Sequence, residues 1–497
     1  MTRTVIVWGT SSGAGKSLLA TALCRVAARR GIDVAPFKAQ NMSNNARVVP
    51  TADGGCGEIG SAQYFQAAAA RVAACTDHNP VLLKPERDTS SQVVVHGRVD
   101  AALSVQPWRE RSAALAAAAR AGFERLAVRH ELIVVEGAGS PAEINLAAHD
   151  YVNLEVARWA RTRGTVAAVL VADIDRGGAF AHLYGTWQLL PDDLRTYLVG
   201  HVLNKFRGDA ALLAPGPQRL RELTGAPVLA VLPMVRDHGL PEEDGLYGDA
   251  DAAPSGAGPH VAIVATPHLS NLDEFQPLAG ACALRWARTP QALERADWII
   301  LPGSKQVSGD LRWLREQGLA DAIVAHARRG GRVLGICGGL QMLGHSLHDP
   351  LGVDGEPYEQ RRGLGLLPLV THHAAPKRLR AARARFDGLH APWRALDGLT
   401  VPGYEIRCGR TESTGSSPAV LHADDGTAIG WQDGPVLGVY AHGLFEAPAV
   451  LQALLGVKGR GLDERLDGLA DLAEAHFEPH ALSRLLDPRS STPSSNP

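Results

Sequence analysis

Residues 5–17 read VIVWGTSSGAGKS, an apolar run that leads into a glycine-rich turn ending in Lys16 and Ser17. Small residues in such a turn let backbone N–H groups surround phosphate oxygens, while a lysine reaches the terminal phosphates and a serine hydroxyl can bind Mg²⁺. The spacing departs from the usual pattern, because Thr10 stands where the first glycine is expected and Gly9 comes one residue too early. The order of apolar run, turn, Lys-Ser pair and helical segment still predicts a nucleotide site. Its predicted contacts are Thr10, Ser11, Gly13, Gly15, Lys16 and Ser17.

Further apolar runs alternate with helix-length segments along the first half of the chain, at residues 132–135, 166–171, 198–203 and 228–231. Runs that are apolar at every position indicate parallel strands buried on both faces, so we expect a doubly wound α/β domain. A second alternation of apolar runs and helix-length segments, also typical of an α/β domain, has its runs at 260–264, 298–301, 332–336 and 436–440. The expected boundaries are 1–248 for the nucleotide-binding domain, 249–259 for a linker, 260–450 for the second α/β domain, 451–487 for a helical extension and 488–497 for a disordered tail.

The composition excludes several classes of protein. The chain has 497 residues, which predicts about three domains or two large ones. Its formal net charge of −2 argues against a nucleic-acid or basic membrane-surface partner. The six cysteines are scattered without a C-x-x-C pair, which argues against a disulfide framework or a zinc ribbon. There is no signal-peptide pattern and no apolar run of about 18 residues, so we expect a cytoplasmic protein without a membrane span.

Acidic side chains follow several predicted strands, and the carboxyl ends of parallel strands meet at one edge of a sheet. Glu136 ends the run at 132–135 and is the main candidate for holding Mg²⁺ together with Ser17. Asp53 and Glu58 are second choices for the metal. Asp173 and Asp175 follow the run at 166–171 and are expected at the same edge.

Asn204 follows the run at 198–203 and is predicted to contact the nucleotide base. Phe206-Arg207 stands where guanine-specific proteins carry a base-reading aspartate, so guanine specificity is not supported.

The second half contains a candidate thiol nucleophile. Residues 335–341 read GICGGLQ, which resembles G-x-S-x-G with sulfur in place of oxygen. A tight strand-to-helix turn exposes Cys337, and a helix N-terminus favours the reactive thiolate. His442 follows the run at 436–440 and is the predicted base. Gly303 and Gly338 are predicted to donate backbone N–H groups to an oxyanion.

The other histidines and cysteines are expected to have structural roles. His372 and His373 lie in a polar stretch and are predicted at the surface. The five cysteines other than Cys337 are predicted to be small buried hydrophobic residues.

Together the two halves resemble a known family. The second half is similar to the class I (triad-type) glutamine amidotransferases and the first to the dethiobiotin-synthetase-like P-loop enzymes, and this fusion is typical of the two cobalamin-pathway amidases. The block FKAQNMSNN at 37–45 resembles the cobyric acid synthase branch. Further similar blocks, within about residues 4–446, are LKP at 83–85, SQVVV at 91–95, EGAGS at 136–140, DIDRGG at 173–178, NKFRGD at 204–209 and GYEI at 403–406.

The resemblance implies an amide ligase with ATP and Mg²⁺ as cofactors and L-glutamine and a corrinoid carboxylic acid as substrates. The implied reaction amidates the b, d, e and g carboxylates of adenosylcobyrinic acid a,c-diamide to give adenosylcobyric acid. Ammonia released at Cys337 is expected to travel through an enclosed path to an acyl phosphate. The expected neighbours of the corrinoid are Gln40, Asn41, Asn45, Asp173 and Asp175.

Two positions depart from the family pattern. Amidotransferases of this class commonly carry His-Pro-Glu, but Leu444 stands two residues after His442. Either His442 works without a carboxylate partner or Glu446 substitutes. Arg407 stands where many relatives carry histidine, and its role is left open.

Two other functions compete with this interpretation. The first is cobyrinic acid a,c-diamide synthase, which performs the same chemistry with two amidations. The second is a non-catalytic P-loop switch related to the partitioning ATPases. It is disfavoured because residues 10–12 (TSS) lack the extra lysine of that group. Membrane-attached members also end in a basic amphipathic helix, whereas residues 462–467 contain more acidic than basic side chains.

Overall fold

The computed structural model describes residues 2–87, 90–235, 238–240, 256–415 and 417–487. They form two compact units, one holding the described residues up to 244 and from 462 onward, the other holding those from 245 to 461. The predicted tail at 488–497 and most of the predicted linker, 249–255, lie outside the described residues. None of the described helices is both long enough and apolar enough to cross a membrane.

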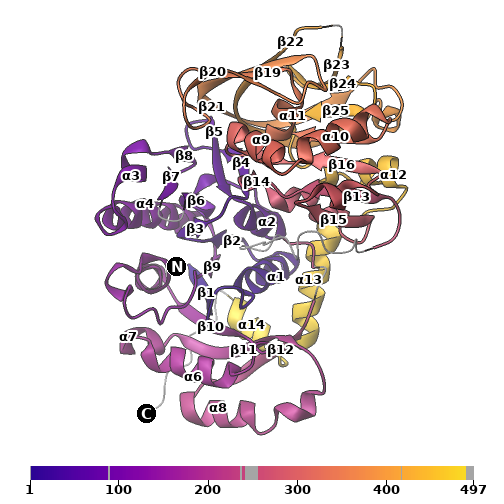
Figure 1. Cartoon of the computed structure of the whole chain (residues 1–497). Helices are drawn as coiled ribbons and strands as arrows, with labels where there is room; N and C mark the ends of the chain where they lie inside the picture. Colours follow the sequence, from indigo (N-terminus) through magenta and orange to yellow (C-terminus); the bar gives the residue numbers. More distant parts are fainter. Residues whose placement is uncertain (1, 88–89, 236–237, 241–255, 416, 488–497) are drawn as a thin grey trace. The chain divides into compact units, whose positions relative to one another are not determined.

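A parallel six-stranded sheet, ordered β12-β11-β10-β1-β9-β2, lies at the centre of the first unit (Figure 1). Its strands are β1 (Arg3–Gly9), β2 (Val34–Phe37), β9 (Leu132–Glu136), β10 (Val166–Asp173), β11 (Leu198–Phe206) and β12 (Val228–Pro233). Every predicted apolar run of this half lies in one of these strands, and the doubly wound α/β fold is confirmed.

Alternate residues of each strand enter two separate cores, which explains why the runs are apolar throughout. Val5 and Val7 pack on the side of α1, α2, α13 and α14, whereas Ile6 and Trp8 pack on the side of α4, α5 and α6. The helices of this unit are α1 (Lys16–Arg29), α2 (Ser61–Ala69), α3 (Ala101–Val105), α4 (Trp108–Arg129), α5 (Val156–Arg163), α6 (Ala179–Leu189), α7 (Asp192–Arg195), α8 (Gly216–Thr224), α13 (Leu462–His476) and α14 (Ala481–Leu486).

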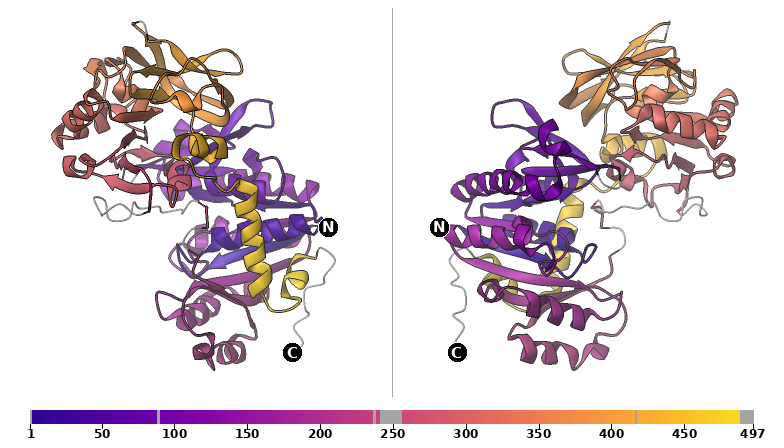
Figure 2. Two further views of the ribbon diagram at one scale, coloured as in Figure 1. Left: turned by 90° about the vertical axis from the view of Figure 1, so that its right-hand side faces the viewer. Right: turned by 60° about the vertical axis from the view of Figure 1, so that its left-hand side comes forward.

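The C-terminal helices belong to different units. The sequence predicted one helical extension over 451–487, but the structure divides this segment: α12 (Pro448–Leu455) belongs to the second unit and α13 and α14 to the first. Helix α13 lies beside α1 (Figure 1; Figure 2). Arg25 of α1 is buried, and its guanidinium pairs with Asp463 at 2.9 Å and Asp467 at 2.8 Å.

Smaller β elements accompany the main sheet of the first unit. A four-stranded sheet has the order β3-β6-β7-β8, and β4 pairs with β5. Their bounds are β3 (Gln40–Met42), β4 (Ala46–Pro50), β5 (Cys56–Gly60), β6 (Val81–Arg87), β7 (Ser90–Val95) and β8 (Arg98–Val99).

The second unit contains an eleven-stranded mixed sheet. Its parallel part is β15-β13-β16-β18-β25, and it continues through β24-β23-β21-β19-β20, with β22 paired to β21. The strands are β13 (His260–Val264), β15 (Ala283–Ala287), β16 (Trp298–Leu301), β18 (Arg332–Ile336), β19 (Ser346–Asp349), β20 (Tyr358–Arg362), β21 (Leu369–Phe386), β22 (Thr400–Ser413), β23 (Ala419–Ala423), β24 (Ala428–Asp433) and β25 (Val436–Val439). Three of the four predicted runs match β13, β16 and β18 residue for residue, and the fourth ends one residue beyond β25.

Helices and a short pair of strands complete the second unit. The helices are α9 (Val307–Glu316), α10 (Leu319–Arg328), α11 (Gly338–Leu343) and α12, and the short antiparallel pair is β14 (Leu269–Ser270) with β17 (Gly303–Ser304). A single hydrophobic core joins the sheet to α9, α10, α11 and α12.

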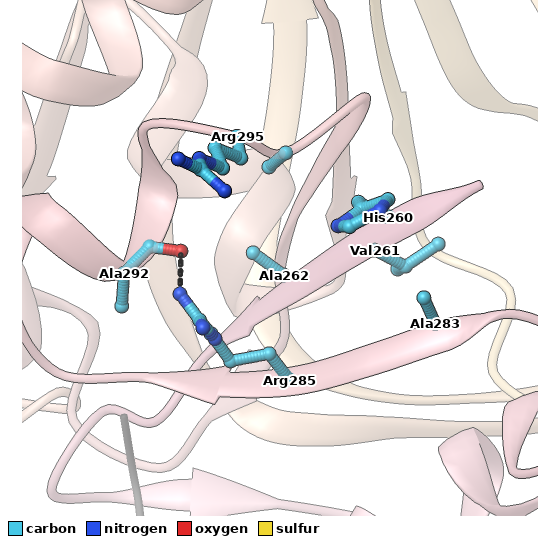
Figure 3. Close-up of a pocket in the computed structure, with 8 residues that line it drawn as sticks. His260, Val261, Ala262, Ala283, Arg285, Ala292 and Arg295 are labelled. Carbon is cyan, nitrogen blue, oxygen red and sulfur yellow. Dashed lines mark hydrogen bonds between the residues drawn. The ribbon is translucent and has the colours of Figure 1, made fainter. Parts of the chain in front are cut away.

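A small cavity of about 120 Å³ lies beside β13 and β15 (Figure 3). His260, Arg285 and Arg295 are among its lining residues, and Arg285 donates a hydrogen bond to the carbonyl of Ala292 at 3.3 Å. His260 begins β13, whereas Cys337 follows the carboxyl end of the parallel strand β18. The cavity therefore contains none of the residues predicted to act in the thiol site.

Candidate active sites

The turn between β1 and α1 has the geometry of a phosphate loop. Gly13 and Gly15 adopt positive φ angles of 70° and 104°, and Gly15 precedes the first residue of α1. A Cβ at Gly15 would collide with Nδ2 of Asn204 unless that side chain moved, and the positive φ also disfavours a larger residue. The buried Lys16 donates through Nζ to the carbonyl oxygens of Ser11 at 3.0 Å and Gly139 at 3.2 Å. The lysine thus lies over the turn, and its contact with the terminal phosphates stays a prediction.

Glu136 is the centre of a buried polar cluster beside this turn. Its Oε1 accepts hydrogen bonds from Ser17 Oγ and Lys38 Nζ, both at 2.8 Å, and its Oε2 accepts from Gln66 and, at 3.5 Å, from Gln63. Burial by itself raises the pKa of Glu136, but the charge of Lys38 and the hydrogen bonds outweigh it and lower the pKa. The carboxylate is therefore ionised and fixed next to the Ser17 hydroxyl.

The predicted metal ligands do not all come together. Ser17 and Glu136 are in contact, and their hydroxyl and carboxylate oxygens suit Mg²⁺. Asp53 lies at the exposed end of the β4–β5 hairpin, where it pairs with Arg98. In the part of the chain that the structure describes, Asp53 contacts Thr51 and Arg98 and not the Ser17–Glu136 pair. Glu58, the other second choice, is buried against Lys84.

Lys38 was not singled out as a functional residue from the sequence. It follows β2 directly, at the same edge of the sheet as Glu136, and is 2% exposed. A basic residue just after an apolar strand was the available signal, but such residues are common at strand ends.

The predicted corrinoid neighbours lie at two places in the first unit. Gln40 accepts a hydrogen bond from the Tyr151 hydroxyl, and Asn41 and Asn45 are buried. Asp173 ends β10 and Asp175 follows it, on the other side of β1 in the sheet order. Asn204 donates through Nδ2 to the carbonyl of Ala14 at 2.9 Å, so in this structure it supports the phosphate loop. The direct contact of Asn204 with a base stays a prediction.

Cys337 occupies the bend between β18 and α11. Its backbone has φ 52° and ψ −104°, a conformation that non-glycine residues rarely adopt, and it is 6% exposed. A Cβ on Gly338 would lie 2.7 Å from the backbone N of Ser304, and one on Gly303 would lie 3.1 Å from Cε1 of His442. These close approaches bring the two predicted oxyanion segments and the predicted base to the same place as the thiol.

Glu274 is the carboxylate partner of His442. Its Oε1 lies 2.9 Å from Nδ1 of His442, and its Oε2 accepts a hydrogen bond from the N–H of Gly443 at 3.1 Å. Both side chains are almost completely buried. The suggestion that Glu446 replaces the missing triad member is therefore wrong, because Glu274 holds that position from a segment 168 residues before His442. A carboxylate between the first two predicted strands of the domain was the only signal in the sequence.

The environment of His442 favours its protonated form. Burial alone would lower the pKa, but the charges of Glu274 and Cys337 and hydrogen bonds to both raise the pKa of His442 to about 10. The Tyr404 ring stacks on the imidazole at 5.2 Å. A charged imidazole beside the sulfur stabilises a thiolate, which is the nucleophilic form of cysteine.

Other expectations about single residues require correction. His373 is buried, because it lies on the inward side of β21 beside Thr371, while His372 is exposed and stacks on His348. Of the five other cysteines, only Cys24 and Cys282 are buried, whereas Cys56 is exposed and Cys75 and Cys408 are intermediate in exposure.

Arg407, whose role the sequence left open, lies over the ring of Tyr440 at 3.9 Å and pairs with Glu405 at 2.8 Å.

Comparisons with known proteins extend over nearly the whole chain. A relative from Methylibium petroleiphilum, named cobyric acid synthase, is 59% identical over 97% of this chain and 97% of its own. Relatives of the same name from Leptothrix cholodnii and Variovorax paradoxus are 59% and 56% identical, each over 98% of this chain and over 98% and 99% of their own. The chain belongs to the cobyric acid synthase family.

Two family profiles match the chain, one over each half. Residues 5–245 match a CobQ/CobB/MinD/ParA nucleotide binding domain, and residues 260–450 match a CobB/CobQ-like glutamine amidotransferase domain. The resemblance stated from the sequence is confirmed, and the chain is a glutamine-dependent amide ligase.

Proposed function

We propose that this chain uses ATP and glutamine to amidate the b, d, e and g carboxylates of adenosylcobyrinic acid a,c-diamide, giving adenosylcobyric acid. The observation that carries the proposal is the assembly of Cys337, His442 and Glu274 from three separate segments of the amidotransferase domain. The name shared by the full-length relatives supports the corrinoid as substrate.

The thiol site supplies ammonia. The Cys337 thiolate attacks the carboxamide carbon of glutamine, and the C–N bond breaks as His442 gives its proton to the leaving nitrogen. Ammonia leaves, and a thioester remains on the sulfur. Water then attacks this thioester with His442 as the base, which releases glutamate and restores the thiol. Backbone N–H groups of Gly303 and Gly338 stabilise the oxyanion in both steps, while Glu274 holds Nδ1 of His442 and stabilises its positive charge.

The phosphate-loop site activates the acceptor. A substrate carboxylate oxygen bonds to the γ-phosphorus of ATP, and the bond from phosphorus to the β,γ-bridging oxygen breaks, so ADP leaves with the electron pair. Ammonia then attacks the acyl carbon, the bond from this carbon to the phosphate oxygen breaks, and phosphate leaves with the proton that the nitrogen loses. Lys16 would hold the phosphates, and Ser17 and Glu136 are the residues that would hold Mg²⁺. Bound Mg²⁺ would neutralise charge on the phosphates.

Mass spectrometry of the products tests the assignment. The purified chain is incubated with glutamine, ATP and Mg²⁺ and with each corrinoid acid in turn. Four added amides on the a,c-diamide are expected. Two amides added to cobyrinic acid itself would identify an a,c-diamide synthase, and no amidation of either acid would contradict the ligase function.

A further inference from the structure

The loop between β10 and α6, residues 174–178, lies beside the phosphate loop and holds an arginine without an assigned role. Asp173, at the end of β10, is 6% exposed. Its Oδ1 accepts the N–H of Asp175 at 3.0 Å, which fixes the start of the loop. Its Oδ2 faces two cations, Lys205 Nζ at 3.1 Å and Arg176 Nε at 3.4 Å.

Arg176 faces the turn that is proposed to surround the phosphates. A Cβ built on Gly13 would lie 3.6 Å from its Nη2, and Gly13 has a positive φ of 70°. The ion pair with Asp173 uses Nε, and the side chain remains 67% exposed. Asp173 therefore anchors the inner end of the guanidinium while its outer edge is directed at the phosphate loop.

The end of β11 supports this arrangement. Lys205 adopts a φ of 62°, a left-handed conformation that non-glycine residues rarely adopt. That conformation accompanies the contact of Nζ with Asp173, while the preceding Asn204 donates to the carbonyl of Ala14 in the phosphate loop. Backbone strain of this kind is concentrated at functional sites.

Arg207 provides an internal comparison. It lies on the same side of the unit and is 56% exposed, but both Nε and Nη2 of its guanidinium engage Asp175. Within the described ranges, the guanidinium of Arg207 contacts Asp175 and not Gly13. Arg207 thus engages Asp175 through two nitrogens, whereas Arg176 pairs with Asp173 through Nε and has its Nη2 near Gly13.

We propose that Arg176 is a catalytic residue of the phosphoryl transfer, contacting the phosphates of ATP from within the same chain. This inference rests on the proposed ligase function. As the bond from the substrate oxygen to the γ-phosphorus forms and the bond to the β,γ-bridging oxygen breaks, negative charge shifts towards ADP. The guanidinium donates N–H groups to the phosphate oxygens where this charge develops, and no proton or further electron pair is transferred.

The test uses full-length Arg176→Ala, Arg176→Lys and Arg207→Ala, each assayed for amidation with ammonium as nitrogen source over a range of ATP concentrations. We expect Arg176→Ala to lower kcat by at least about 10²-fold with little change in the KM for ATP. Arg176→Lys should recover part of the loss, because lysine supplies the charge without the planar fork. Arg207→Ala should stay within about threefold of wild type.

Glutaminase activity and thermal unfolding of each variant report whether the chain is intact. A kcat for Arg176→Ala within about threefold of wild type, an equal loss in Arg207→Ala, or an effect on the KM for ATP alone would overturn the role of Arg176. Failure of the wild-type chain to amidate any corrinoid acid would instead contradict the proposed function, and the two failures are therefore distinguishable.

Discussion

The two strand-to-helix turns that bear the proposed chemistry bend the chain with different residues. After β1, Gly13 and Gly15 take the positive φ angles, whereas after β18 the residue at the bend is Cys337 itself, with φ 52°. Glycine adopts such angles readily, while another residue there costs about 1–3 kcal/mol. The phosphate turn acts through its backbone and can use glycine. The thiol turn needs its side chain at the bend and therefore accepts strain.

The buried carboxylates of the two sites differ in the cationic group that each one contacts. Glu136 and Glu274 are both 0% exposed and each contacts one cationic group. Glu136 contacts the side-chain nitrogen of Lys38, and Glu274 contacts the imidazole of His442, the side chain type that most readily gains and loses a proton near neutral pH. The phosphoryl site requires fixed charge, whereas the thiol site requires a group that transfers protons.

The largest expected effect comes from removing one reactive group from each site. Cys337→Ala should lower glutamine-driven amidation on the order of 10⁴-fold or more and leave ammonia-driven amidation largely intact. Lys16→Ala should abolish amidation with either nitrogen source and spare at least basal glutaminase. Both nitrogen sources and glutamate release are assayed for each variant. Loss of ammonia-driven synthesis in Cys337→Ala would make the cysteine structural, and normal amidation by Lys16→Ala would contradict the nucleotide site.

Breaking the buried pair of the phosphate site should mainly change stability. Lys38→Met leaves the Glu136 carboxylate buried without its cation, and we expect a loss of about 3–5 kcal/mol in the free energy of unfolding. Adding Glu136→Gln should restore part of the loss, because the buried charge is then gone. Denaturant unfolding of the full chain measures both. Arg98→Met at the exposed pair with Asp53 is the matched control and should cost at most about 1 kcal/mol.

Glu274→Gln tests the titrating pair of the thiol site. Removing the carboxylate should lower glutaminase on the order of 10²-fold or more, as when a triad carboxylate becomes an amide, and ammonia-driven amidation should not change. Glu446→Gln is the control and should keep wild-type glutaminase within about threefold. Equal losses in the two variants would return the partner role to Glu446.

The same variant has a pH signature in stability. The pKa of His442 is raised in the folded chain to about 10, above its ordinary value near 6.5. Its contribution to stability is therefore fully present below about pH 6.5 and is lost as the pH rises through about 10. Since Glu274 is a main source of the raised pKa, Glu274→Gln should be most destabilised near pH 6 and converge on wild type near pH 10. Thermal unfolding at pH 6, 8 and 10 measures this, and a pH-independent difference would contradict the titration.

The architecture could be predicted well from the sequence because strands and turns are indicated by residues that are close together in the chain. Apolar runs such as 132–135 and 332–336 lie in strands, and glycines around residue 13 and residue 337 indicate the two turns. Contacts between distant segments were not accessible in this way. Glu274 meets His442 across 168 residues, and Lys38 meets Glu136 across 98, and neither spacing follows from periodicity.

Surface and interior were also harder to assign than strands. His373 was expected at the surface because its neighbours are polar, but alternation along β21 turns it inward with Thr371 while His372 faces outward. A polar stretch in a strand still has one buried side, and only the pairing with β22 shows which side it is.

The smallest expected effect concerns the strain at the thiol bend. Cys337→Gly should unfold with a free energy about 1 kcal/mol higher than Cys337→Ala, because relief of the left-handed strain exceeds the added freedom of glycine in the unfolded chain. Both variants lack the thiol, so loss of catalysis does not confound the comparison. At the other turn, Gly15→Ala should be clearly destabilising, since its Cβ would meet Asn204 at 1.9 Å. Denaturant unfolding of the full chain measures all three, and equal stability of the two Cys337 variants would show that the backbone at this bend relaxes once the cysteine is gone.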